Sequence, residues 1–424
     1  MISIDHIEEF RQTELPIVIY GADLVGKAMY NACKSLGIKV ECFCDDSIWK
    51  IELSGTPIVF GLDVVEPAKL RDRFSDAHFL VSSTYINDII GHLESLGFDK
   101  WYDCSLLRGF DCWADQYTDS WGKRTLLGAF VDFTVNACLL SHEGYLNKDK
   151  LFVRCVDLVI TEKCSLKCRD CSNLMQYYLK PKNYSLEDTL RSIDLLCEQV
   201  DEIYEMRVIG GEPFMNKDTH LIIERLAREE KIKRIVIYTN GTIPLRREQI
   251  SSFVHDKIMF LLTDYSQSSA LITRQKSTSK IDQLEAQLKE NGIDYDRKPV
   301  GGWVDCATID HYERTPEENQ KVFDYCCAKN NVTLMAGDSK LYNCPFAANG
   351  YTLGAFPSEI ANEGIGDIID ISEKDDDIKN KIHDFVYRKD FVSACDYCAG
   401  REYEKPEIVP AVQTLVPLKY KKYV

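Results

Sequence analysis

The stretch Cys164-Ser-Leu-Lys-Cys168-Arg-Asp-Cys171 follows Asp157-Leu-Val-Ile-Thr161, an apolar and β-branched run. The run predicts a buried strand, so the three cysteines share the loop that leaves it. Cysteine thiolates are the ligands of iron–sulfur clusters, and three of them can bind three of the four irons of a 4Fe–4S cube. The fourth iron would then keep an open position at which chemistry can take place.

Strands and helices alternate downstream of this loop. Helices are predicted from Ser185, which can cap one, and over 281–290, and strands over 206–209, 234–238, 258–262 and 293–295. Polar and glycine-rich segments follow three of the strands: Gly210-Gly-Glu-Pro213, Thr239-Asn-Gly-Thr242 and Thr263-Asp-Tyr-Ser266. Because parallel barrels place their active sites at the carboxyl ends of the strands, the pattern predicts a partial barrel whose site is built from these loops.

Residues 13–110 show a second α/β pattern, which predicts a doubly wound parallel sheet. The turn from Gly21 to Gly26 precedes a helix and could cradle a phosphate, and Asp45-Asp46 after the second strand could meet a ribose hydroxyl. The middle glycine of the dinucleotide fingerprint is missing, so docking or scaffolding stays an open alternative. Residues 101–150 are aromatic and irregular, and we expect a packed linker there, with Trp101, Trp113 and Trp121 at interfaces.

Composition narrows the class of partner. The 424 residues carry a net charge of −16, which disfavours nonspecific binding to nucleic acid or to an anionic membrane. The longest apolar run, 126–140, contains Asp132 and is too short for a membrane span. No secretory signal is recognisable, so we expect a cytoplasmic protein. In that compartment 17 cysteines indicate metal binding or catalysis rather than disulfides, although most of those outside the clusters should simply pack.

The Cys-x3-Cys-x2-Cys spacing after a strand, with Gly-Gly-Glu-Pro on the next strand, resembles the radical S-adenosylmethionine (SAM) superfamily over roughly 151–400. The resemblance implies that Cys164, Cys168 and Cys171 ligate a 4Fe–4S cluster whose open iron chelates SAM. It also implies cofactor contacts at the strand ends, by Gly210, Gly211, Glu212, Pro213, Thr239, Asn240 and Asp264. A structural zinc knuckle is the alternative, but zinc takes four ligands and the loop offers three.

One position departs from the family pattern. An aromatic residue usually stands before the third cysteine, near the adenine of SAM, whereas this chain has Asp170. Adenine packing must therefore differ or come from elsewhere, and Tyr177 and Tyr178 are the candidates we name.

A second cysteine set lies in 311–424, where a hairpin is predicted over 332–342. Its members are Cys326, Cys344, Cys395 and Cys398, with Cys327 as an alternative to Cys326. The arrangement resembles the SPASM/twitch auxiliary-cluster domain, and the nearest match is a dehydrogenase that oxidises an aminocyclitol alcohol. Four cysteines would fully ligate a second 4Fe–4S cluster, which suits electron transfer. Zinc is again the alternative. Cys306, after the last barrel strand, could be a catalytic hydrogen donor or simply a buried thiol.

The N-terminal stretch also resembles the Rossmann-like domain of bacterial sugar acyltransferases, in its glycine turn, its "DD" and the following Gly55-x-Pro57. The expected architecture is thus a Rossmann-like domain (1–110), a linker (111–150), a partial (β/α)6 TIM barrel (151–310) and an auxiliary-cluster module (311–424). The expected function is radical oxidation or epimerisation of a carbohydrate or cyclitol, free or nucleotide-linked, with a flavodoxin- or ferredoxin-type reductant. A peptide-modifying maturase and a noncatalytic zinc-binding scaffold are the alternatives.

Overall fold

The computed structural model divides into two compact units, Met1–Phe152 and Val153–Val424. It describes residues 1–46, 58–109, 126–266, 268, 278–326, 328, 331–357, 366–388, 390–401 and 405–423. Three residues named above, Trp113, Trp121 and Cys327, lie outside the described residues, as do Gly55 and Pro57.

The first unit is built on a six-stranded sheet with the order β3-β4-β2-β1-β5-β6. Its strands are β1 (Ile17–Tyr20), β2 (Cys42–Cys44), β3 (Ile58–Val59), β4 (Leu62–Val65), β5 (His78–Val81) and β6 (Trp101–Tyr102). Among the described strands of this sheet, β3 runs antiparallel to its neighbour and the other five pair in parallel. In chain order these five follow 3-2-1-4-5, which is the order of a doubly wound fold. The α/β architecture predicted for this unit is confirmed.

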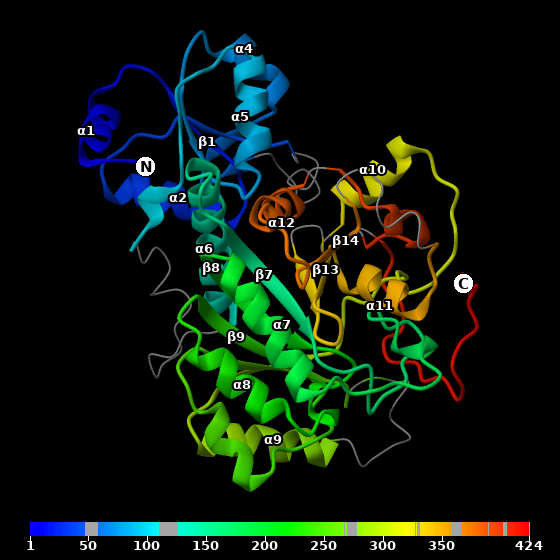
Figure 1. Ribbon diagram of the computed structural model, residues 1–424. Helices are drawn as coiled ribbons and strands as arrows, with labels where there is room; N and C mark the ends of the chain where they lie inside the picture. Colours follow the sequence, from blue (N-terminus) through cyan, green and yellow to red (C-terminus); the bar gives the residue numbers. More distant parts are fainter. Residues whose placement is uncertain are drawn as a thin grey trace. The chain divides into compact units, whose positions relative to one another are not determined.

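Helices cover this sheet through two apolar cores. They are α1 (Ile4–Gln12), α2 (Leu24–Ser35), α4 (Leu70–Arg73), α5 (Ile86–Ser95) and α6 (Leu126–Leu146) (Figure 1). The expectation of an irregular segment before residue 150 is wrong for α6. This helix buries Val131, Val135, Cys138 and Leu139 in the core of the first unit. It is apolar around much of its circumference, so its sequence carries only a faint helical period.

The second unit holds an eight-stranded sheet with the order β11-β10-β9-β8-β7-β12-β13-β14. The strands are β7 (Phe152–Val159), β8 (Glu202–Ile209), β9 (Ile232–Thr239), β10 (Ile258–Asp264), β11 (Asp294–Pro299), β12 (Val332–Met335), β13 (Lys340–Tyr342) and β14 (Ile368–Asp370). Strands β8 to β11 pair in parallel, and β12 is parallel to β7. The sheet is open, as a partial barrel requires.

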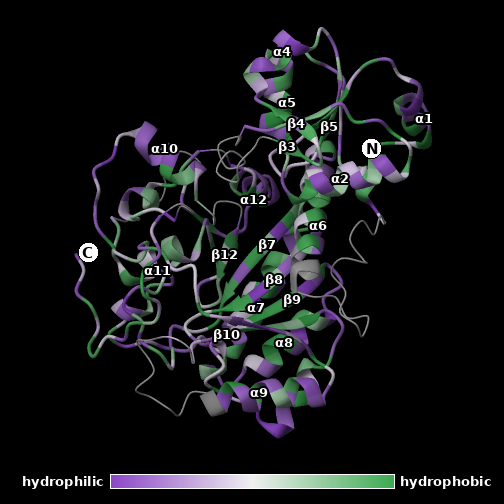
Figure 2. Ribbon diagram, turned by 180° about the vertical axis from the view of Figure 1, so that it is seen from behind, coloured by the Kyte–Doolittle hydropathy of each residue, from purple (hydrophilic) through white to green (hydrophobic). Residues whose placement is uncertain are grey.

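Helices α7 (Leu186–Gln199), α8 (Thr219–Arg228) and α9 (Thr278–Glu290) connect these strands and lie along one side of the sheet (Figure 1). Each combines hydrophobic and hydrophilic stretches (Figure 2), and α7 and α8 bury Ile193, Leu196, Ile222 and Leu226. Because α7 and α8 connect neighbouring parallel strands, the loops after β7, β8 and β9 come together at one edge.

The remaining helices of the second unit are α10 (Pro316–Asp324), α11 (Pro345–Leu353) and α12 (Ile378–Val386). The predicted hairpin exists as β12 and β13, but it does not form a sheet of its own. Strand β12 continues the main sheet beside β7, with Thr333 opposite Asp157. Among the described residues, no helix is both long and apolar enough to cross a membrane.

Candidate radical SAM site

The three cysteines of the first set lie in the loop that follows β7, at the carboxyl edge of the sheet. Backbone hydrogen bonds join this loop to the segment after β8: Gly211 N donates to Thr161 O (3.1 Å) and Glu212 N to Lys163 O (2.8 Å). Cys168 is buried, and Cys164 and Cys171 are partly buried. The two segments singled out from the sequence are therefore in direct contact.

Gly210 and Gly211 are required by this contact. Gly210 has a φ of +154°, and a Cβ there would lie 2.4 Å from Thr161 O. A Cβ on Gly211 would lie 2.3 Å from Lys163 O and 2.8 Å from the Cβ of Cys164. Since real Cβ atoms do not approach other heavy atoms so closely, only glycine lets β8 end against the cysteine loop.

The Glu212 side chain is hydrogen-bonded to the carboxyl end of β9 and does not point into solvent. It is fully buried, and its carboxylate accepts hydrogen bonds from Thr239 Oγ1 (2.8 Å), Asn240 N (2.8 Å) and Phe214 N (3.3 Å). Burial raises the pKa of Glu212 to about 7, although these three hydrogen bonds lower it. Pro213, which is buried, is the first residue of a 3-10 turn, and its carbonyl accepts a hydrogen bond from Thr219 Oγ1 at 2.7 Å.

The three sulfurs are each approached by N–H donors. Asn240 Nδ2 lies 3.7 Å from Cys164 Sγ, and Gln413 Nε2 lies 3.2 Å from Cys168 Sγ. Backbone N–H groups of Asn173 and Met175 lower the pKa of Cys171, although burial raises it overall. A ring of donors suits sulfurs that carry negative charge, as thiolate ligands of iron do. The residues present therefore fit an iron–sulfur cluster.

Asn240 belongs to a small polar network beside the loop. Its Nδ2 also donates to Ser165 Oγ (3.0 Å), and its Oδ1 accepts from Thr242 N (3.0 Å). Asp264, in contrast, is held by Arg297, whose Nε and Nη2 lie 2.9 and 2.6 Å from Asp264 Oδ2. Burial raises the pKa of Asp264, but hydrogen bonds from Ser266 and the contact with Arg297 bring it below its usual range.

Two aromatic side chains that the sequence did not single out lie at this loop. Tyr265 and Trp303 pack edge to face, with ring centroids 6.4 Å apart, against a cluster that contains Leu166 and Cys168. Tyr177 and Tyr178 are buried in a larger core, against which Cys164 and Cys171 also pack, and their hydroxyls donate to Ala307 O and Asn349 Oδ1. Asp170 pairs with its neighbour Arg169 at 3.1 Å.

Members of the second cysteine set, Cys326, Cys344, Cys395 and Cys398, influence one another electrostatically. Three of their sulfurs accept backbone N–H bonds at 3.4 Å, from Ala328, Ala347 and Gly400. Cys344 also caps α11, where the helix dipole favours a thiolate. The structure thus gathers four cysteines from three separate segments of the chain.

Cys306 is buried and lies beside the second cysteine set. Its carbonyl oxygen is 4.0 Å from Cys398 Sγ, and its thiol is among the groups that raise the pKa of Cys398. The next residue, Ala307, accepts hydrogen bonds from Gln176 and Tyr177, which follow the third cysteine of the first set.

Neither set is arranged for a single zinc ion. Zinc–sulfur bonds of 2.3 Å in a tetrahedron place the sulfurs about 3.8 Å apart. Within the described part of the chain, one group of three or more His, Cys, Asp or Glu has all its ligand atoms within 4.8 Å, and it contains no member of either set. That group is Cys104, Cys138 and His142, all buried in the first unit.

The hydrogen bonds of His142 argue against a metal ion bound by Cys104, Cys138 and His142. Cys104 N donates to His142 Nδ1 (2.9 Å), so the ring proton stays on Nε2, which lies 2.8 Å from Ser83 O. A metal on Nε2 would move the proton to Nδ1, facing the N–H of Cys104. The group is therefore a hydrogen-bonded part of the core.

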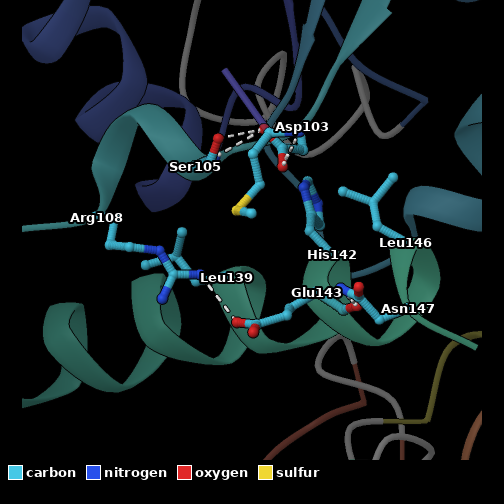
Figure 3. A pocket seen from close by; sticks show the side chains of 9 residues that line it. Asp103, Ser105, Arg108, Leu139, His142, Glu143, Leu146 and Asn147 are labelled. Atoms are coloured by element: carbon cyan, nitrogen blue, oxygen red, sulfur yellow. Dashed lines mark hydrogen bonds and ion pairs between the residues drawn. The ribbon is translucent and has the colours of Figure 1, made fainter. Parts of the chain in front are cut away.

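A pocket of about 190 Å³ lies next to His142 (Figure 3). Its polar groups already have partners, since Arg108 pairs with Glu143 at 2.9 Å and Asp103 accepts from Ser105 N and Ile2 N. Elsewhere in this unit, Asp45 Oδ2 accepts the N–H of Ala22 in the glycine turn at 2.7 Å. The backbone N–H of Ala22 is thus already hydrogen-bonded to a carboxylate and is not available to a phosphate, which counts against nucleotide binding at this turn.

The model of the "Radical SAM superfamily" matches residues 158–297. Curated relatives include a GTP 3',8-cyclase of Syntrophomonas wolfei, 28% identical over 163 residues, or 37% of this chain and 47% of the relative. Molybdenum cofactor biosynthesis protein moc-5 of Caenorhabditis elegans is 36% identical over 87 residues, 20% of this chain and 14% of the relative. The chain thus spans less than half the length of these relatives.

Solved structures are also similar to parts of this chain, at low identity. BtrN in complex with AdoMet and 2-DOIA is 15% identical, with a TM-score of 0.38 over 61% of this chain and 98% of that one. His6-tagged anSMEcpe with bound AdoMet is 13% identical, with a TM-score of 0.38 over 64% and 89%. Such TM-scores add nothing to what the strands and loops of this chain show. Residues 158–297 are thus similar to a radical SAM superfamily domain, and they contain the three-cysteine loop and the two glycines that contact it.

Proposed function

We propose that the protein is a radical SAM enzyme in which Cys164, Cys168 and Cys171 hold a 4Fe–4S cluster. The proposal rests on the N–H donors that approach all three cysteine sulfurs. The loop that carries these sulfurs lies directly against the end of β8, at a contact where only glycine fits. When bound, the cluster and SAM supply reductive cleavage of the sulfonium and a 5′-deoxyadenosyl radical that abstracts a substrate hydrogen.

The chain's own residues position this chemistry. Gly210 and Gly211 bring their backbone close to the loop, and Glu212 ties Thr239 and Asn240 into one rigid edge. We assign these residues, with Pro213, to the binding of SAM. Asp264 belongs to the same edge, but its ion pair with Arg297 gives it a supporting part. Tyr265 and Trp303 supply an apolar wall beside the cysteine loop, which helps to exclude water.

The second cysteine set is proposed to hold an auxiliary 4Fe–4S cluster through Cys326, Cys344, Cys395 and Cys398. Members of both cysteine sets pack against one apolar core that includes Tyr178, Phe346 and Tyr397. A fully ligated cluster across such a core suits the acceptance of an electron from a substrate radical. Residues 311–424 would then be a SPASM/twitch-like module, although its strands continue the main sheet.

For the substrate we retain a carbohydrate or cyclitol, which would be oxidised or epimerised, with Cys306 as the candidate hydrogen donor in the second case. A nucleotide-linked substrate has less support because Asp45 occupies the glycine turn. The peptide-maturase alternative predicts a winged-helix leader-binding domain, whereas the described part of the first unit is an α/β fold on a mostly parallel sheet. A flavodoxin- or ferredoxin-type reductant in the cytoplasm completes the proposal.

The test is anaerobic incubation with SAM, dithionite and a panel of sugars, cyclitols and nucleotide sugars. We expect 5′-deoxyadenosine to form in proportion to the loss of one substrate class, and Cys164→Ala to abolish both. Cys197→Ala is the control, since this buried cysteine lies on α7 and belongs to neither set. If the wild-type chain produces no 5′-deoxyadenosine from SAM, either with the panel or in the absence of any substrate, the enzyme assignment is contradicted.

A further inference from the structure

Residues 407–414 form a strap, of which 412–414 pair antiparallel with the cysteine loop. Cys168 forms a β-bridge with Gln413. Arg169 N donates to Val412 O (2.6 Å), and Thr414 N donates to Lys167 O (2.7 Å). The strap therefore fixes the backbone on both sides of the middle cysteine.

The side chain of Gln413 is oriented without ambiguity. Its Oε1 accepts the backbone N–H of Lys167 at 2.7 Å, and an N–H can only donate. Its Nε2 must therefore face the other way, where it lies 2.8 Å from Ala411 O and 3.2 Å from Cys168 Sγ. The amide NH₂ group of Gln413 thus donates both to the Cys168 sulfur and to the carbonyl of Ala411, two residues earlier in the strap.

The strap is itself anchored from other parts of the second unit. Ile408 N donates to Trp303 O (2.8 Å), and Ser268 Oγ donates to Pro410 O (2.9 Å). Ala411 is fully buried and has a φ of +62°, a left-handed conformation that is unfavourable for alanine. Such a conformation persists only where surrounding contacts impose it, which is what the bond from Gln413 to Ala411 O does.

We propose that Gln413 is a positioning residue for the first cluster, which makes that cluster easier to reduce by donating a hydrogen bond to the Cys168 thiolate. The inference rests on the proposed function, because it requires the cluster to be present. A hydrogen bond to a ligand sulfur stabilises negative charge there, and the reduced cluster carries one electron more than the oxidised one. Loss of the bond should therefore lower the reduction potential.

The test uses the full-length chain, reconstituted anaerobically, with an EPR-monitored redox titration. To leave one signal, the titration is made in a Cys395→Ala/Cys398→Ala background, in which the second set cannot hold a full cube. Gln413→Ala should shift the midpoint of the remaining cluster to a lower potential. Gln413→Glu should shift it further, because a carboxylate oxygen would face the thiolate and the carbonyl of Ala411.

Gln287 provides a matched control. Its amide makes the same two-sided contact with Leu245, accepting from Leu245 N (3.0 Å) and donating to Leu245 O (2.9 Å), without touching a sulfur. Gln287→Ala should leave the midpoint unchanged. Iron content serves as a second readout, and the cluster of Gln413→Ala should be lost to a chelator several-fold faster than that of Gln287→Ala.

The outcomes separate the two proposals. A background chain that holds no cluster contradicts the proposed function. If the background chain holds a cluster and Gln413→Ala and Gln413→Glu leave its midpoint and chelation rate unchanged, the inference about Gln413 is wrong. A Gln287→Ala chain that shifts as much as Gln413→Ala also overturns it, because the effect would then reflect general loosening of the fold.

Discussion

Substitution of Gly211 by alanine probes the contact on which the site depends. The added Cβ would lie 2.3 Å from Lys163 O and 2.8 Å from the Cβ of Cys164, whereas ordinary contact begins at 3.4 Å. The cysteine loop would have to retreat from β8 by about 1.1 Å, the difference between 3.4 and 2.3 Å. Nearby hydrogen bonds between the segments, such as that from Glu212 N to Lys163 O, would have to stretch as well.

The magnitude follows from the nature of the neighbours. Overpacking costs about 1–3 kcal/mol, and we expect about 3 kcal/mol here because the obstructing atoms are backbone and cannot rotate away. At about 2–4 °C per kcal/mol, the melting temperature of the metal-free chain should fall by about 6–12 °C. Metal–ligand distances tolerate only about 0.2 Å, so a displaced Cys164 should also reduce iron uptake by the first set.

The assay pairs differential scanning calorimetry of the metal-free chain with iron analysis after anaerobic reconstitution. Gly301→Ala is the control, because a Cβ there meets nothing within 4 Å. It should leave both quantities unchanged. If the Gly211→Ala chain has the same melting temperature as the control and binds as much iron, the argument that glycine is needed at this contact is refuted.

Two further predictions concern titration and helix stability. Because burial raises the pKa of Glu212 from 4.5 to about 7, the folded chain binds a proton that the unfolded chain has lost between these pH values. Wild-type stability should therefore decline by about 3 kcal/mol as the pH rises from 4.5 to 7, and urea unfolding of Glu212→Gln should lack this decline; equal slopes for the two chains would contradict the assignment. Gly91 is exposed within α5 and a Cβ there meets nothing within 4 Å, so Gly91→Ala should stabilise the first unit by about 0.5–1 kcal/mol in thermal unfolding. A lower melting temperature for that variant would count against α5 as described.

Local signals in the sequence were sufficient for the α/β fold and for the first cysteine loop. Apolar runs such as Asp157–Thr161 marked buried strands. Gly210 and Gly211 were expected to contact the cofactor, whereas the contact that the structure shows for them is with the backbone of the cysteine loop. The sequence failed where the signal is not local. The helical period of α6 is faint because its apolar residues surround much of the axis, and the hairpin at 332–342 gave no sign that β12 would pair with β7.

The residues around the sulfurs show the same limit. Gln413 lies 245 residues from Cys168 in the chain, and no periodicity or spacing links them. Tyr265 follows β10 directly, so its place beside the loop could have been inferred from the strand end, whereas Trp303 could not. Asp264 was expected to contact cofactor or substrate, but its partner Arg297 lies on the neighbouring strand, and parallel register alone does not reveal which charges pair.

Iron and sulfide analysis of the anaerobically reconstituted chain tests the central claim most directly. Two 4Fe–4S clusters predict about eight irons and eight sulfides per wild-type chain. Removal of the first set by Cys164→Ala/Cys168→Ala/Cys171→Ala should leave about four, and removal of Cys395 and Cys398 should leave about four held by the first set. A wild-type chain that is colourless and carries zinc with no iron would contradict the account.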